Sequence, residues 1–185
     1  MPNWCQNILD IAGPEHVVSK IIEMVKPESD PANSELSLAK MVPPPPDIGE
    51  GWYDWNINNW GTKWDVDAQV TSRDNGFVTY SFDSAWSPPV EAIEKFASKF
   101  SDVTFTLKYC EGGGDFGGVF SVEPNGLGGH IVNSEDMSFY DAYEFMYGEP
   151  PEGYEDEEDD EEEEIVYGQE EAKEETNAGN DIPTE

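Results

Sequence analysis

The sequence predicts an α+β fold in which two helices cover one face of an antiparallel sheet. Two observations lead to this prediction. Four segments alternate apolar and polar residues, which is typical of half-buried strands. Two further segments repeat apolar residues at spacings of three and four, which is typical of amphipathic helices. The length of 185 residues suits one domain with additional segments.

The first strand and the first helix are expected near the start of the chain. Residues 6–11 predict the strand, because Leu9 and Ile11 fall on one face and polar residues on the other. Pro14 suits the first turn of a helix, and Pro27 is expected to stop it. The apolar stripe of this helix consists of Val18, Ile21, Ile22 and Val25.

Residues 28–63 are predicted to form an irregular insert that includes a polyproline stretch at residues 43–46. The insert also carries Trp52, Trp55 and Trp60. Side chains of this size bury large apolar areas, so we expect the insert to pack on the domain. A short helical turn is expected around residues 52–60.

Three more strands and a second helix are expected after the insert. The Asn75-Gly76 pair predicts a hairpin turn between the second and third strands. Ser87 and Pro88 suit the cap and first position of the second helix. The inner faces of the predicted strands consist of Trp64, Val66, Ala68 and Val70, then Val78, Tyr80 and Phe82, and finally Val103, Phe105, Leu107 and Tyr109.

The resulting order is βαββαβ, which is the ferredoxin-like pattern. A glycine-rich turn at residues 111–115 then leads into a further hairpin near residues 116–122 and 129–132. Residues 138–147 predict a third helix. We therefore assign residues 1–148 to one ferredoxin-like domain, with the insert at 28–63 and a C-terminal extension at 112–148.

Acidic residues dominate the charge of the chain, which has 41 acidic and 9 basic residues and a formal net charge of −32. Residues 149–185 carry net −17, and residues 1–148 still carry net −15. Few apolar groups accompany the acids of residues 149–185, so we predict a disordered tail. Its unbroken acidic run, a candidate interaction segment, consists of Glu155, Asp156, Glu157, Glu158, Asp159, Asp160, Glu161, Glu162, Glu163 and Glu164.

This charge limits the classes of partner. Phosphate backbones and anionic membranes attract Lys and Arg, so direct binding to nucleic acid or membrane is not expected. Basic proteins and divalent cations are the expected partners. Residues 1–13 lack the features of a secretory signal, and no apolar run approaches a membrane span, which favours a cytoplasmic location. Cys5 and Cys110 are predicted to point to opposite faces of the sheet and to stay reduced.

The phrases of the chain that are richest in tryptophan also resemble a known family. They are Pro2-Asn3-Trp4-Cys5, Asn59-Trp60-Gly61-Thr62-Lys63-Trp64-Asp65, and Phe82-Asp83 with Ala85-Trp86-Ser87-Pro88-Pro89, to which Tyr109, Glu111, Phe116 and Gly118 add. On these residues the chain resembles the YubB-like ferredoxin-like domain family of phages, plasmids and bacteria over roughly residues 1–126. The resemblance implies the ferredoxin-like fold and an accessory protein of a mobile element in a bacterial host. It supplies no catalytic residues, and it places the acidic tail outside the family's pattern.

The candidate binding residues come from the same phrases and their neighbours. They are Trp60, Lys63, Trp64, Asp65, Asp67, Asp83 and Trp86. One interpretation is an aromatic-walled pocket that holds a cation and carboxylates. The other is a packing corner, in which Trp60 and Trp64 are structural anchors and Lys63 pairs with an aspartate or stacks on a ring.

No catalytic, metal-binding or cofactor-binding motif is found. His16 and His130 are the two histidines, and neither lies in a zinc-binding or nucleophile pattern. An RNA-binding sheet would need aromatic platforms flanked by basic residues. The open face of the predicted sheet is polar and acidic instead, with Asp10, Asp65, Asp67, Asp83, Thr104 and Thr106 against Lys108.

The leading hypothesis is a non-enzymatic protein that binds a basic surface of a host protein. A nucleic-acid-binding or defence protein presents such a surface, and DNA mimicry is the sharpest form of the hypothesis. One alternative is a small-molecule-binding or enzymatic module that uses the tryptophan pocket. In a third interpretation, the tail only solubilises a structural domain. The sequence leaves the oligomeric state open.

Overall fold

The computed structural model describes residues 3–28 and 33–153. The chain divides into two compact units, Met1–Pro151 and Glu152–Glu185. All described helices and strands belong to the first unit. The predicted disorder of residues 149–185, together with the acidic run, falls almost entirely outside the described residues and stays a prediction. Within the described ranges, no helix has the length and apolar composition that crossing a membrane requires.

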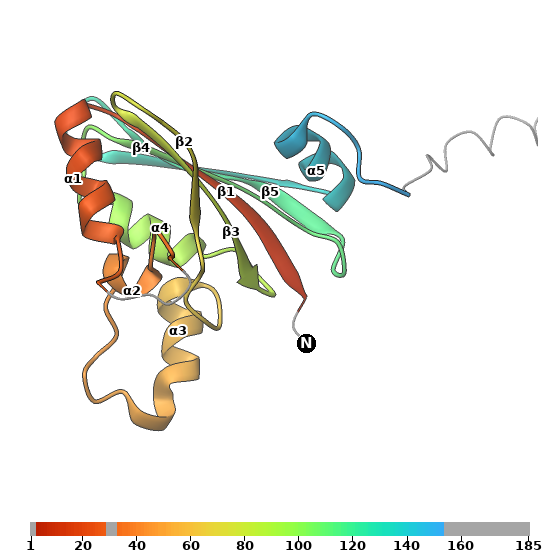
Figure 1. Cartoon of the computed structure of the whole chain (residues 1–185), viewed down its shortest axis with the longest axis horizontal. Helices are drawn as coiled ribbons and strands as arrows, with labels where there is room; N and C mark the ends of the chain where they lie inside the picture. The colour runs from red at the N-terminus through yellow and green to blue at the C-terminus, as the bar shows by residue number, and fades with distance from the viewer. Residues whose placement is uncertain (1–2, 29–32, 154–185) are drawn as a thin grey trace, which may run out of the picture. The chain divides into compact units, whose positions relative to one another are not determined.

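A six-stranded antiparallel sheet runs through the first unit in the order β2-β3-β1-β4-β5-β6 (Figure 1). The strands are β1 (Trp4–Ala12), β2 (Gln69–Asp74), β3 (Phe77–Ala85), β4 (Thr104–Glu111), β5 (Phe116–Pro124) and β6 (His130–Met137). The first four strands follow the order expected for βαββαβ. The last two extend the sheet as the predicted C-terminal hairpin, and the predicted fold class is confirmed.

Helices α1 (Glu15–Val25) and α4 (Val90–Ala97) cover one face of the sheet. The predicted stripe of α1 is buried throughout, because a spacing of three and four places its apolar residues on one side of a helix. Alternate residues of the strands face these helices. The largest fully buried side chains of this core include Leu9, Ile11, Ile21, Tyr80, Ile93, Phe96, Phe105 and Leu107.

The insert packs on the domain as predicted, and it contains α2 (Leu38–Met41), the 3₁₀ turn η1 (Gly49–Gly51) and α3 (Trp52–Trp60). Trp60 is 5% exposed, and its Nε1 donates to the carbonyl of Val42 at 2.9 Å. Its ring lies edge-on to that of Trp55, with centroids 5.6 Å apart. The Lys99 ammonium donates to the carbonyl of Met41 at 3.1 Å, which ties the insert to the end of α4.

The prediction for the second strand is wrong in its boundaries. Residues 65–68 belong to no strand, and the segment bonds to the insert and not to the sheet. The Glu35 amide donates to the Ala68 carbonyl at 2.8 Å, and the Ala68 amide donates to Ser34 Oγ at 3.0 Å. Val66 and Ala68 are buried as the alternation predicted. Alternation of apolar and polar residues indicates only that one side of a segment is buried. A segment that packs against an insert therefore shows the same two-residue period as a strand of a sheet.

The third predicted helix is α5 (Phe139–Tyr147), and it packs on the face of the sheet away from α1 and α4 (Figure 1). Its cap is Ser138, whose Oγ accepts from the Asp141 amide at 3.1 Å. The buried residue of the helix is Ala142, which lies so close to Gly117 of β5 that a Cβ on this glycine would overlap it. The open face is therefore covered in part, a feature that the sequence did not predict.

Both cysteines are free and buried, and they lie on opposite faces as predicted. Cys110 pairs with Gln6 in the sheet register, so Cys5 is one residue out of phase with it. Burial raises the pKa of Cys5 to about 12 and the pKa of Cys110 to about 11. Because the thiolate is the nucleophile, neither residue is poised for chemistry at neutral pH.

Candidate functional site

Three tryptophans from three separate segments form an exposed row at one end of the sheet. Trp4 begins β1, Trp64 follows α3 and Trp86 follows β3. The ring centroids of Trp4 and Trp64 are 6.5 Å apart, and those of Trp64 and Trp86 are 5.9 Å apart. These side chains are 50%, 39% and 42% exposed respectively. Contiguous exposed aromatic groups mark interaction surfaces more often than single ones do, and we call this set the tryptophan row.

Hydrogen bonds between the family-like phrases hold the row in place. The Trp86 amide donates to the Asn3 carbonyl at 3.0 Å, and Thr62 Oγ1 donates to the Ala85 carbonyl at 3.0 Å. Trp86 also has a φ of +65°, a left-handed conformation that bulky residues rarely adopt. Strain of this kind costs about 1–3 kcal/mol and is concentrated at functional positions. The structure therefore stabilises an unfavourable backbone that places the Trp86 ring in the row.

The Lys63 ammonium lies on the rings of the row. Its Nζ is 4.5 Å from the ring centroid of Trp64, 5.0 Å from that of Trp86 and 5.7 Å from that of Tyr53. Cations within about 6 Å of an aromatic face are attracted by the ring quadrupole. Of the two arrangements predicted for Lys63, stacking on a ring is the one observed. The tryptophan row therefore already binds a cation from its own chain.

A surface depression of about 340 Å³ adjoins the row at Trp4. It is lined by Trp4, Asp65, Asp67 and Asp83. All three aspartates are exposed residues. Partial burial of the carboxyl group raises the pKa of Asp83, because desolvation disfavours the charged form. We call this feature the acidic depression, and its chemistry suits a cationic group.

Asp65 has a structural role that the sequence analysis missed. Its Oδ2 accepts from Ser37 Oγ at 2.6 Å, and its Oδ1 accepts from the Leu38 amide at 2.6 Å. A carboxylate in this position satisfies amides at the start of α2 that have no partner within the helix. The main role of Asp65 is therefore to cap α2, and the residue also lines the acidic depression.

We expect Asp65→Ala to lower the free energy of unfolding by about 0.5–2 kcal/mol, as is typical when a helix cap is lost. Asp67→Ala is the matched control, because Asp67 is exposed and its carboxylate accepts one long bond, from Gln69 Nε2 at 3.4 Å. Urea denaturation of both variants measures the difference. Equal midpoints for the two variants would contradict a capping role for Asp65.

The structure divides the predicted residues into two groups. Trp60 belongs to the core, as the packing interpretation expected. Trp64 was also expected as a buried anchor, and this expectation is wrong because its ring lies in the exposed row. The surface group consists of Lys63, Trp64, Asp65, Asp67, Asp83 and Trp86. The sequence analysis missed Trp4 and Tyr53, although the antiparallel pairing of β1 with β3 places Trp4 opposite Ala85, next to Trp86.

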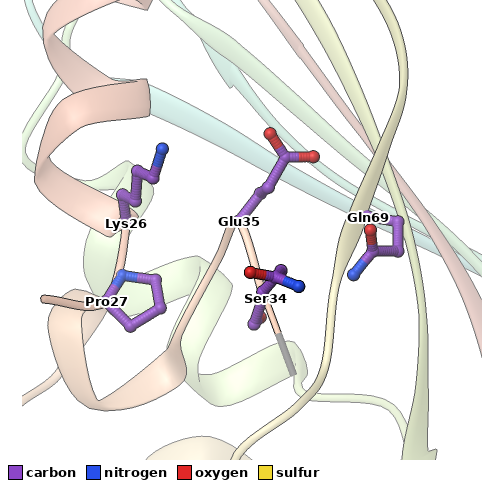
Figure 2. A pocket seen from close by; sticks show the side chains of 6 residues that line it. Lys26, Pro27, Ser34, Glu35 and Gln69 are labelled. Atoms are coloured by element: carbon purple, nitrogen blue, oxygen red, sulfur yellow. The ribbon is translucent and has the colours of Figure 1, made fainter. Parts of the chain in front are cut away.

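A second depression, of about 370 Å³, lies between the end of α1, the insert and β2 (Figure 2). Figure 2 shows Glu35 and Gln69 on facing segments. Two of its polar groups are engaged within the chain, because Glu35 Oε2 accepts from the Val70 amide at 2.8 Å and Ser34 Oγ donates to the Leu36 carbonyl at 2.7 Å. The bond between Glu35 and Val70 joins the insert to β2, and the bond from Ser34 lies within the insert. The polar groups of this depression therefore stabilise the packing of the insert, and the depression is a weaker candidate for a binding site than the tryptophan row.

Metal binding finds no support within residues 3–28 and 33–153. In these ranges no three His, Cys, Asp or Glu side chains are grouped so that they could hold a metal ion. His130 lies with its Nε2 2.9 Å from the carbonyl of Phe100, so this ring also has a partner within the domain. The chemistry of the site is that of aromatic faces and carboxylates.

Comparison with known proteins finds one matching family model and one similar solved structure. The family described as "Ferredoxin-like domain in Api92-like protein" matches residues 59–182. The match includes most of the acidic tail, which corrects the expectation that the tail lies outside the family's pattern. The crystal structure of a protein api92 from Yersinia pseudotuberculosis is similar with a TM-score of 0.52 and 10% identity, covering 75% of this chain and 99% of that one. At this identity the likeness shows the fold alone. No curated protein matches the chain.

Proposed function

The chain belongs to the family of ferredoxin-like domains in Api92-like proteins, and from this premise we propose that it is a non-enzymatic protein that binds a basic surface of a partner protein. The family description names a fold and no activity, so the proposal rests on the site. The observation that carries it is an exposed tryptophan row that already holds a lysine ammonium and ends in an acidic depression.

The charge of the domain supports a basic partner. Residues 1–148 carry net −15 and residues 149–185 a further −17, so the whole chain attracts cations over a long range. Between described residues, the ion pairs join Lys40 to Glu28 and Lys108 to Asp10. Asp67 and Asp83 of the acidic depression have no ion pair within this part of the chain. Their carboxylates are therefore available to a cation from a partner, whereas that of Asp65 is engaged at the start of α2.

The aromatic groups narrow the class of partner further. Aromatic rows also bind single-stranded nucleic acids, but those proteins place the rings in a positively charged groove. Here the rings lie beside carboxylates, which repel phosphate. Side chains of Arg and Lys bind both to aromatic faces and to carboxylates. A protein surface rich in these residues fits the site best.

The finer form of the proposal adds a biological setting. In it, the chain is a YubB-like accessory protein of a phage or plasmid that acts in the cytoplasm of a bacterial host. Its partner is a nucleic-acid-binding or defence protein, and the acidic surface and tail compete with DNA for that partner. The resemblance of the tryptophan phrases and the charge of the chain support this setting.

Affinity capture from a bacterial lysate, with the full chain and with a chain ending at residue 153, tests the proposal. We expect a basic protein whose association slows with salt, because added ions shorten the Debye length, which is about 8 Å at physiological ionic strength. Deletion of the tail should slow association without abolishing it, since long-range attraction acts mainly on the on-rate.

The recovered partner is then purified, and its binding kinetics are measured from low to high salt with and without competing duplex DNA. Competition by DNA would support mimicry. Affinity that does not change with salt would overturn the proposal, and so would a failure to recover any basic protein. A small molecule that raises the melting temperature and depends on Trp64 would then favour the ligand-binding alternative.

A further inference from the structure

We propose that the tryptophan row and the acidic depression together bind arginine side chains of an extended basic segment, and that Lys63 occupies the row until such a segment displaces it. The inference rests on the proposed function, because it names the chemical group that this site recognises on a basic partner. It also commits to one class of occupant, a segment of another protein with arginines at alternate positions.

The spacing of the row matches an extended peptide. Successive rings are 6.5 Å and 5.9 Å apart. An extended chain rises about 3.2–3.4 Å per residue, and alternate side chains point to the same side. Side chains at positions i and i+2 are therefore about 6.5 Å apart, and they can contact neighbouring rings of the row without a turn in the peptide.

The acidic depression favours a guanidinium group over other cations. This group is planar, it can stack on a ring, and it donates two parallel hydrogen bonds to one carboxylate. Trp4 supplies a ring at the depression, and Asp67 and Asp83 supply exposed carboxylates beside it. The carboxyl group of Asp83 is partly buried, and the lost solvation raises its pKa. An arginine placed there would offset that loss.

Lys63 shows that the row accepts a cation, and it is also a competitor for the row. Its ammonium is within 5.0 Å of the ring centroids of Trp64 and Trp86. As part of the same chain, it is present at a high effective concentration. An ammonium is more strongly hydrated than a guanidinium, which allows an incoming arginine to replace it. Removal of Lys63 should therefore strengthen the binding of an arginine peptide.

The backbone around the row is organised before binding. The Asn56 side-chain amide donates to the Lys63 carbonyl at 2.7 Å, and Trp86 is fixed by its bond to Asn3. Asp83 is part of β3, which pairs along its length with β1. A rigid arrangement loses less conformational entropy when a peptide binds. The site therefore needs no rearrangement other than departure of the Lys63 side chain.

The test uses the full chain and a synthetic acetyl-Gly-Arg-Gly-Arg-Gly-amide peptide, with titrations followed by tryptophan fluorescence and by the indole N–H signals in NMR. The control peptide replaces both arginines with citrulline, which has the same shape and no charge. We expect the arginine peptide to shift the indole signals of Trp4, Trp64 and Trp86, and the citrulline peptide to bind at least tenfold more weakly. Equal binding of the two peptides would overturn the inference.

Two pairs of variants locate the peptide at the site. Asp83→Asn should weaken peptide binding about tenfold, whereas Asp74→Asn should change it less than twofold. Asp74→Asn makes the same charge change at the end of β2, where Asp74 pairs with Phe77 at the opposite end of β3 from Asp83. Lys63→Met should strengthen binding several-fold more than Lys20→Met, a matched loss of charge on the exposed side of α1. Equal effects within either pair would show that only the net charge matters, and would overturn the inference.

The peptide test can give a negative result while the lysate test gives a positive one, so failure of the inference is distinguishable from failure of the proposed function. If the peptide does not discriminate between the variants while a basic partner is still captured in a salt-dependent way, the proposed function stands and the contact lies elsewhere on the domain or its tail. Circular dichroism and melting temperatures of each variant are measured alongside. Asp83→Asn and Lys63→Met change exposed or half-buried groups, so both variants are expected to fold.

Discussion

Replacement of Trp60 by alanine should lower the free energy of unfolding by about 3–5 kcal/mol, the range typical of deleting a large buried aromatic side chain. Trp60 is 5% exposed and packs edge-on against Trp55. Its indole also donates to the carbonyl of Val42 at 2.9 Å. The variant therefore loses buried apolar area and leaves this carbonyl without its partner. Because the same residue ends α3, the loss should loosen the whole insert.

Trp64→Ala is the matched control, since it removes the same side chain from the same phrase at a position that is 39% exposed. We expect its cost to be less than half of that for Trp60→Ala, because less apolar surface returns to water. Guanidinium denaturation of both variants gives the comparison, with equal slopes required for a two-state reading. A Trp64→Ala variant as unstable as Trp60→Ala would contradict the division of these two tryptophans between core and surface.

The pair of tryptophans shows what the sequence could predict and what it could not. The spacing of apolar residues predicted the buried stripe of α1 correctly, because a helix of eleven residues contains several turns over which the spacing repeats. The segment from Trp64 to Val70 gave the same kind of signal as a sheet strand, yet Ala68 bonds to Ser34 and Glu35 of the insert, and pairing with β3 begins at Gln69. An alternating pattern gives no information on which backbone lies alongside. That information comes from contacts between residues distant in sequence.

The sequence predicted most residues of the candidate site, but it did not predict how they are arranged. Lys63, Trp64 and Trp86 do meet at one surface, and Asp83 lies beside Trp4 in the adjoining acidic depression. The capping role of Asp65 depends on where α2 begins, and a four-residue helix leaves almost no periodic signal. The sequence also predicted α5 without indicating which face of the sheet it covers. In that placement Ala142 lies so close to Gly117 that a Cβ on this glycine would overlap it.

Substitution of Gly117 by valine should release α5 from the sheet and make Cys110 reactive. A Cβ at Gly117 would overlap the Cβ of Ala142 and would lie 2.8 Å from the carbonyl oxygen of Tyr109. Ala142 belongs to a single helix at the end of the domain, whereas Tyr109 lies within the sheet. The strain is therefore expected to be relieved by movement of α5. Cys110 then loses the cover that buries it in the intact structure.

The expected effect on thiol chemistry is large. Burial raises the pKa of Cys110 to about 11, so at pH 8 roughly one thiol in a thousand is ionised, and the fraction grows about tenfold per pH unit below that pKa. An exposed cysteine has a pKa near 8.5, which corresponds to roughly a quarter ionised at pH 8. Labelling by a disulfide reagent should accelerate by roughly two orders of magnitude in Gly117→Val.

The position of the label distinguishes release of α5 from general unfolding. Cys5 faces the core under α1 and α4, and burial raises its pKa to about 12, so local release should leave Cys5 unlabelled. Mass spectrometry after proteolysis identifies the labelled residue. Gly51→Val is the control, because a Cβ there meets nothing within 4 Å. Equal labelling of Cys5 and Cys110 would mean that the domain as a whole opens, and unchanged labelling of Cys110 would mean that α5 does not shield it.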